Sequence, residues 1–204
     1  MPMSYTTLVS GKTTPGSVHN FCNYLKVPVE VVLEEAQAII YSLLRVREMK
    51  TAAVITLTAA ASSVALPTGY LEPIAMRDRE GWDTIPHNFV EETTLLRRRI
   101  YTDDVLETGT PMLVSVFDEA FQFDCKAEEE RKYDLVYYKQ PTLLSTTNTT
   151  NFLTNRYPNI LRKGCQAGAA SFKQDDVQDY AALLAELTGL IDRANAESDM
   201  GRAA

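Results

Sequence analysis

The spacing of hydrophobic residues changes twice along this 204-residue chain, and this change is what most limits the folds available to it. Apolar residues recur at intervals of three and four from Pro28 to Arg47 and again from Asp176 to Asp199, as on one face of an amphipathic helix. Between these segments, residues 52–139 are rich in β-branched and aromatic side chains and in turn residues. The chain is therefore predicted to carry helices at both ends and strands in the middle.

Two segments of the middle region show the strand pattern most clearly. In AFQFDC the alternation places Phe121 and Phe123 on one face of a strand. In YDLVYYK it places Tyr133, Leu135 and Tyr137 on one face. Both sets are predicted to contribute to the core of an antiparallel sheet.

The patterns together predict an α+β fold, in which the N- and C-terminal helices form a helical bundle and an antiparallel β-sheet subdomain is inserted between them. On the helix expected from Tyr157 to Phe172, Gly164 and Gly168 would allow another helix to approach closely. The predicted divisions are a flexible N-terminal arm (1–16), the bundle (17–50 and 156–200), the inserted β-rich subdomain (51–155) and a C-terminal tail (201–204).

A short helix is expected within the sheet region, from His87 to Ile100. Acidic residues lie near its start, and Arg97, Arg98 and Arg99 lie near its end, an order that the helix dipole favours. These arginines are candidates for contact with a partner or with DNA in a channel. The alternative is ordinary solvated charge at a helix end.

Composition argues against several classes of protein. A formal net charge of −7 opposes a protein whose main task is to grip nucleic acid, although an acidic wall would let DNA slide past without sticking. No stretch approaches the roughly 20 apolar residues of a membrane span. The three cysteines are far apart and lack metal-ligand spacing, and no hydrolase, metalloprotease or nucleotide-binding motif is present. The sequence therefore predicts no catalytic residue, no metal site and no cofactor.

Several segments in a fixed order carry a resemblance to a known family. After paired N-terminal helices come the Leu66-Pro67 step and LEPIAMRD, then HNFVEETTLLRRR and Gly109-Thr110-Pro111. LVYYKQPTLLS, NFLTNRYPNIL and a pair of C-terminal helices follow. Over roughly residues 17–200 the chain resembles the head-to-tail adaptor proteins of tailed bacteriophages, which are also called neck, connector or head-completion proteins.

The resemblance implies a structural virion protein without enzymatic activity. It would dock as a ring, expected to be dodecameric, under the portal protein ring, extend the DNA channel and provide the attachment platform for the tail. Its expected partners are the portal, tail or further neck proteins and other copies of itself. Genomic DNA would pass without sequence-specific binding, and no membrane is involved. The expected location is the head–tail junction of the virion, after synthesis in the host bacterial cytoplasm.

By the same similarity, portal docking is expected near the C-terminus, because the C-terminal helix and tail of related adaptors commonly reach the portal. Removing residues 195–204 should then abolish portal binding and leave the fold intact. The inserted sheet is a candidate for contact with a neighbour or with the tail. The candidate portal-interface residues are Arg193, Asn195, Glu197, Asp199, Met200 and Arg202.

Three alternatives remain open on the sequence. Another neck or tail component, such as a tail-tube terminator or a connector, would bind the adaptor instead of the portal. A small hydrolase or nuclease would need converging acid, base or metal-ligand residues. A DNA-binding regulator would show salt-sensitive DNA binding. The free adaptor is expected to be a monomer whose arm and tail become ordered on docking.

Overall fold

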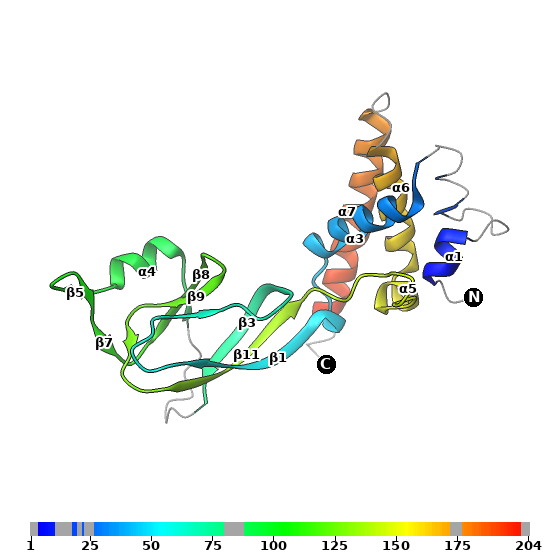
Figure 1. Ribbon diagram of the computed structural model, residues 1–204. Helices are drawn as coiled ribbons and strands as arrows, with labels where there is room; N and C mark the ends of the chain where they lie inside the picture. The colour runs from blue at the N-terminus through cyan, green and yellow to red at the C-terminus, as the bar shows by residue number, and fades with distance from the viewer. Residues whose placement is uncertain are drawn as a thin grey trace. The chain divides into compact units, whose positions relative to one another are not determined.

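The chain divides into two compact units. The computed structural model describes residues 4–10, 18, 19, 22, 27–79, 88–171 and 177–200. Unit 1 consists of Met1–Met49 and Gln140–Ala204, and unit 2 consists of Lys50–Lys139. Helices dominate unit 1 and strands dominate unit 2, as Figure 1 shows. The predicted α+β class is confirmed.

Unit 1 buries apolar residues where its three longer helices pack together. Its described helices are α1 (Tyr5–Ser10), α3 (Val29–Leu43), the 3-10 helix η1 (Arg47–Met49), α5 (Phe152–Arg156), α6 (Pro158–Ser171) and α7 (Val177–Met200). Buried residues of α3 include Val32, Leu33, Ala36 and Ile40, and those of α7 include Leu187, Ile191 and Ala194.

Helices α3 and α6 approach each other closely because α6 carries glycines on the side that faces α3. A Cβ atom at Gly168 would lie 3.2 Å from the backbone oxygen of Val32, and one at Gly164 would lie 2.8 Å from Ile40 Cδ1. These small residues therefore allow the tight helix packing that the sequence predicts.

Helix α3 ends earlier than its apolar pattern suggests. The expected helix extends to Arg47, but Leu44 is already extended, with ψ at 130°, and a 3-10 turn follows at Arg47–Met49. The reason lies in the C-terminal helix, whose side chains accept the backbone N–H groups of Arg45 and Arg47. These bonds replace the helical hydrogen bonds that a longer α3 would make.

The segment between the last strand and α5 belongs to unit 1, although the sequence-based division assigned residues up to 155 to the sheet subdomain. The buried Gln37 side chain of α3 accepts the backbone N–H of Leu144 at 2.7 Å. Asn151 caps α5 in a capping box with Thr154 and donates to the hydroxyl of Tyr41. Side-chain hydrogen bonds thus attach an aperiodic segment to the helices.

The N-terminal segment contains a helix where the sequence suggests an irregular arm. Leu8 of α1 is buried, and the backbone N–H of Tyr5 donates to Thr149 O at 2.7 Å. A single buried leucine provides too short a pattern for periodicity to reveal. Most of the expected first N-terminal helix, from Ser17 to Leu25, lies outside the described residues.

Unit 2 contains a three-stranded sheet in the order β1-β11-β3 and a four-stranded sheet in the order β2-β9-β8-β4. Two further two-stranded pairs are β10-β7 and β5-β6. The described elements are β1 (Lys50–Leu57), β2 (Ser63–Ala65), β3 (Tyr70–Asp78), β4 (Asn88–Phe89), α4 (Glu92–Arg98), β5 (Tyr101–Thr102), β6 (Val105–Leu106), β7 (Thr108–Gly109), β8 (Leu113–Phe117), β9 (Ala120–Phe123), β10 (Lys126–Ala127) and β11 (Arg131–Lys139).

The core of unit 2 contains the aromatic residues that the alternation selects. Phe121 and Phe123 are fully buried in β9, and Tyr133, Leu135 and Tyr137 are buried on one face of β11. Phe123 and Tyr133 stack with ring centroids 5.3 Å apart, which joins the two sheets. The predicted inward faces of both strands are confirmed.

Two expectations for unit 2 need correction. The helix expected from His87 to Ile100 covers only Glu92–Arg98, because the backbone N–H of Val90 donates to Val114 O and extends the pairing of β4 with β8. That pairing is parallel, as is the pairing of β10 with β7, so the sheets are not purely antiparallel. The turn expected at Asp78–Gly81 lies partly outside the described residues.

Candidate interaction surfaces

The end of α7 supplies side chains that complete the fold of unit 1. Asn195 Oδ1 accepts the backbone N–H of Arg45 at 2.7 Å, and Asn195 Nδ2 donates to Leu43 O at 3.2 Å. Ser198 Oγ accepts the backbone N–H of Arg47 at 2.8 Å. These bonds satisfy polar groups released where α3 ends. Of the candidate portal residues, Asn195 therefore has a structural role inside unit 1.

Other candidates lie on the exposed side of the same helix. Arg193 Nε donates to Glu197 Oε1 at 3.0 Å, and their side chains are 79% and 56% exposed. Asp199 is also exposed. Met200 is the last described residue, and Arg202 lies outside the described part of the chain. The structure thus brings Arg193 and Glu197 together and separates both from the inward-facing Asn195.

The three consecutive arginines at the end of α4 do not act as one cluster. Arg97 and Arg98 are exposed in its last turn. Arg99 is half-buried, and its guanidinium donates to Phe123 O at 3.1 Å and to Gln122 Oε1 at 3.0 Å. Arg99 fastens the end of α4 to strand β9, so only Arg97 and Arg98 are available to a partner.

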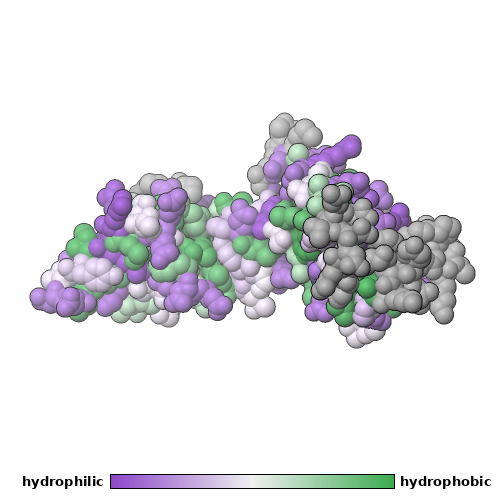
Figure 2. Space-filling view, turned by 90° about the horizontal axis from the view of Figure 1, so that it is seen from above, coloured by the Kyte–Doolittle hydropathy of each residue, from purple (hydrophilic) through white to green (hydrophobic). Residues whose placement is uncertain are grey.

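Four exposed apolar residues lie close to these arginines in the sequence. Leu96 of α4 is 46% exposed, and Ile100, Tyr101 and Val105 around the β5-β6 hairpin are 54–62% exposed. We call these four residues the hairpin patch. On the face of unit 2 seen in Figure 2, green hydrophobic residues are interspersed with purple hydrophilic ones. Exposed apolar and aromatic residues beside arginine are typical of protein–protein contact surfaces.

Sequence reasoning missed the hairpin patch, although a signal was present. The backbone N–H of Glu107 donates to Ile100 O, and Asp103 and Asp104 both have positive φ, so the chain reverses tightly there. A two-residue Asp-Asp turn between Tyr101-Thr102 and Val105-Leu106 is a hairpin signal. A hairpin this short has no opposing layer of its own, which leaves Tyr101 and Val105 exposed, whereas Leu106 is buried.

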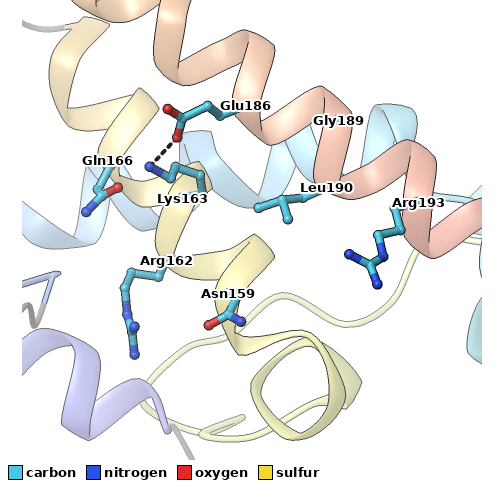
Figure 3. Close-up of a pocket in the computed structure, with 8 residues that line it drawn as sticks. All are labelled: Asn159, Arg162, Lys163, Gln166, Glu186, Gly189, Leu190 and Arg193. Carbon is cyan, nitrogen blue, oxygen red and sulfur yellow. Dashed lines mark ion pairs between the residues drawn. The ribbon is translucent and has the colours of Figure 1, made fainter.

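Unit 1 contains an open groove of about 670 Å³ between α6 and α7. Figure 3 shows Arg162 of α6 and Arg193 of α7 extending to the same side, while Lys163 turns toward Glu186. Arg162 is exposed and has no acidic partner among the residues that the structure describes. The remaining lining residues are Asn159, Gln166, Gly189 and Leu190. Lys163 is paired with Glu186, and Arg193 is paired with Glu197. Among the described lining residues, Arg162 therefore carries the unpaired charge, and it makes the groove basic.

Glycine in a helix interior is less favourable than alanine by about 1 kcal/mol, so the presence of Gly189 inside α7 calls for an explanation. Gly164 and Gly168 are explained by their contact with α3, which leaves no room for a larger side chain. A Cβ atom at Gly189 would meet no atom of the chain within 4 Å. The packing of unit 1 therefore does not require a glycine there, and the space above it is open.

The cysteines lack the features of catalytic nucleophiles. Burial and the nearby Glu30 carboxylate raise the pKa of Cys22 to about 11, and burial and Asp124 raise the pKa of Cys125 to about 11. Burial also raises the pKa of Cys165. Near neutral pH these thiols are protonated and poorly reactive. His19 Nδ1 is hydrogen-bonded to Val9 O and has no place in a catalytic pair.

The described residues include neither a metal-binding cluster nor a membrane-spanning helix. No group of three or more His, Cys, Asp or Glu side chains within this part of the chain could hold a metal ion. Across the same ranges, no helix is both long and apolar enough to cross a membrane.

Comparison with known proteins identifies one family. The model of the family described as SU10 adaptor protein matches residues 26–204, which include α3, all of unit 2 and the C-terminal helices. No curated protein matches the chain.

Proposed function

The chain belongs to the SU10 adaptor family of phage head-to-tail adaptor proteins, and on that premise we propose that it docks as a ring under the portal. In this role it extends the DNA channel and provides the attachment platform for the tail. The observation that carries the proposal is the family match over residues 26–204, which spans both units. Proteins of such a family are structural components of the virion neck, and we propose no enzymatic activity for this one.

The exposed end of α7 is the proposed portal contact. Arg193 and Glu197 present one charge of each sign to solvent, and the chain continues beyond them to residues 201–204. Because Asn195 and Ser198 hold the other side of this helix to the end of α3, the exposed side is kept in a fixed position. A fixed contact surface loses less conformational entropy on docking than a flexible one.

The hairpin patch is the proposed contact with the tail or the next neck protein. Tyr101 and the adjacent Arg97 and Arg98 are of the residue types that commonly dominate binding energy in protein interfaces, and the neighbouring apolar residues can exclude water around them. The net charge of −7 supports the channel role, because an acidic wall repels phosphates and lets DNA pass.

Portal docking is tested by binding to the purified portal of the same phage. The deletion of residues 195–204 is a poor test, because it removes Asn195 and Ser198 and so damages unit 1. A stop after Met200 together with Glu197→Arg leaves both hydrogen-bonded residues in place and does not change a lining residue of the α6–α7 groove. We expect co-sedimentation with the portal to be lost and the thermal unfolding midpoint to stay within a few degrees of that of the wild-type chain. Unchanged co-sedimentation would refute docking through this end of α7.

The alternative is a different position in the neck, in which the chain binds the portal-docked adaptor and not the portal. The exposed hairpin patch is compatible with that position too. The same co-sedimentation assay separates the two, with a preformed portal–adaptor complex as a second bait. Binding to the second bait alone would favour the alternative.

A further inference from the structure

Unit 1 has a second charged surface, opposite in sign to the basic groove. On α3, Glu30, Val31, Glu34 and Ala38 are exposed, with Val31 45% exposed. Neither glutamate has an ion-pair partner among the described residues. These four residues lie at positions i, i+1, i+4 and i+8, which form one stripe along a helix. We call them the α3 stripe.

The α3 stripe and the groove lie on opposite sides of the α3–α6 layer. Val32, Ala36 and Ile40 of α3 face Gly164 and Gly168 of α6. Arg162 and Gln166 each lie two residues from those glycines, about 200° around the helix. Glu34 and Ala38 lie two residues from Ala36 in the same way. Each helix therefore presents its charged side away from the other helix.

From this arrangement we infer that the α3 stripe of one copy docks in the α6–α7 groove of a second copy of this chain. The occupant is identified by charge, because the groove is basic and the stripe is acidic, and by the open space above Gly189, which lets a helix approach α7 closely. One head-to-tail contact of this kind covers both surfaces at once. An unrelated acidic partner would account for the groove alone.

A contact between two different surfaces of the same chain repeats from copy to copy and closes into a ring when the rotation allows it. This inference rests on the proposed function, which requires a ring, and specifies which surfaces join neighbouring subunits. Exposed ion pairs are individually weak, so the contact forms mainly when the portal holds neighbouring copies at high effective concentration.

The test uses charge reversal and its rescue. Glu34→Arg and Arg162→Glu each replace the attraction between the α3 stripe and the groove by a repulsion. The double variant restores the attraction, because the two charges have exchanged places. Glu128→Arg, at an exposed turn of unit 2, is the matched control for the charge change. A further variant, Gly189→Leu, places a side chain in the groove where a Cβ atom meets nothing of the chain itself.

The measurement is the distribution of copies bound per portal ring, by native mass spectrometry at a copy-to-site ratio below one. The wild-type chain and Glu128→Arg should fill portals in an all-or-none manner, because bound neighbours help each other. The two single charge variants and Gly189→Leu should give broad, partial occupancy and need about tenfold or more free protein to fill the ring. The double charge variant should restore all-or-none filling.

The outcomes separate this inference from portal docking. If both single variants fill portals in the same all-or-none way as the wild-type chain, the contact is refuted and portal docking stands. If the wild-type chain adds nothing to the portal, the proposed function fails, and sedimentation of the free chain at high concentration decides the contact. Self-association that both single variants lose and the double variant regains would support it, and a wild-type chain that stays monomeric would refute it.

Discussion

Asn195 joins two helices that are far apart in the sequence through a single amide. Its oxygen accepts from the backbone of Arg45, and its nitrogen donates to the carbonyl of Leu43. Both partners lie where α3 stops making helical hydrogen bonds, so no neighbouring residue of α3 can replace the amide. The amide therefore couples the last turns of α7 to the end of α3.

Asn195→Ala should lower the free energy of unfolding by about 1–3 kcal/mol, because it leaves a part-buried N–H and a carbonyl without their partner. Glu197→Ala, on the exposed side of the same helix, is the control and should cost less than about 1 kcal/mol. Urea unfolding of the intact chain measures both. Equal losses for the two variants would contradict the structural role of Asn195.

The raised pKa values of Cys22 and Cys125, both about 11, predict a loss of stability in alkali. In the unfolded chain these thiols ionise near their ordinary pKa of about 8.5. Their contribution to stability is complete below that pH and is lost as pH rises toward about 11. The urea concentration at the unfolding midpoint should therefore decrease as the pH rises through this interval. It should decrease less steeply in a Cys22→Ala/Cys125→Ala variant. An equally steep fall in that variant would contradict the assignment to these thiols.

At the scale of helices, glycines in α6 and α7 have opposite surroundings. A Cβ atom added at Gly168 would lie 3.2 Å from the backbone oxygen of Val32. A Cβ atom added at Gly189 would meet open space. Alanine gains the same intrinsic helix propensity at both positions. Any difference between the two substitutions therefore measures packing against α3.

Gly189→Ala should stabilise the chain by about 0.5–1 kcal/mol. Gly168→Ala should be less stable than Gly189→Ala by about 1–3 kcal/mol, because a backbone oxygen cannot move aside as a flexible side chain can. Thermal or urea unfolding of the two variants side by side gives this difference. Equal stability of the Gly168→Ala and Gly189→Ala variants would contradict the close packing of α3 on α6 at Gly168.

The helices and long strands could be predicted because their period extends over many residues. The short elements could not, since two-residue strands such as β4 carry no period, and the sheet bond from Val90 to Val114 decides where α4 begins. The same limit applies to Arg97–Arg99. Their place at a helix end was visible in the sequence, but only the tertiary contact with Phe123 and Gln122 separates Arg99 from the other two.

At the scale of the whole molecule, the change from helical to strand spacing and back predicts a chain of two parts. The structure divides it at Lys139/Gln140, whereas the sequence-based division lies at residue 155. Residues 140–151 are attached to unit 1 by long-range bonds such as that from Leu144 to Gln37, and such bonds leave no local pattern. The basic groove was missed for a related reason, because its residues come from two helices whose relative rotation the sequence does not give.

The hairpin patch and the end of α7 lie on different units and should act independently. Tyr101→Ser combined with Val105→Ser should weaken binding to the tail or next neck protein by about tenfold or more, since both side chains are exposed and apolar. Portal binding should not change. Binding assays with each partner check this, and Val54→Ser, at another exposed apolar residue of unit 2, is the control. Loss of portal binding in the Tyr101/Val105 variant would contradict the division of roles.

In the proposed function, the chain adds to the portal as a ring. The most direct measurement is the mass of the portal of the same phage before and after mixing with this protein, by native mass spectrometry, with each component alone as reference. We expect the portal to gain a full ring of subunits. A portal of unchanged mass would contradict portal docking and favour a position further along the neck or tail.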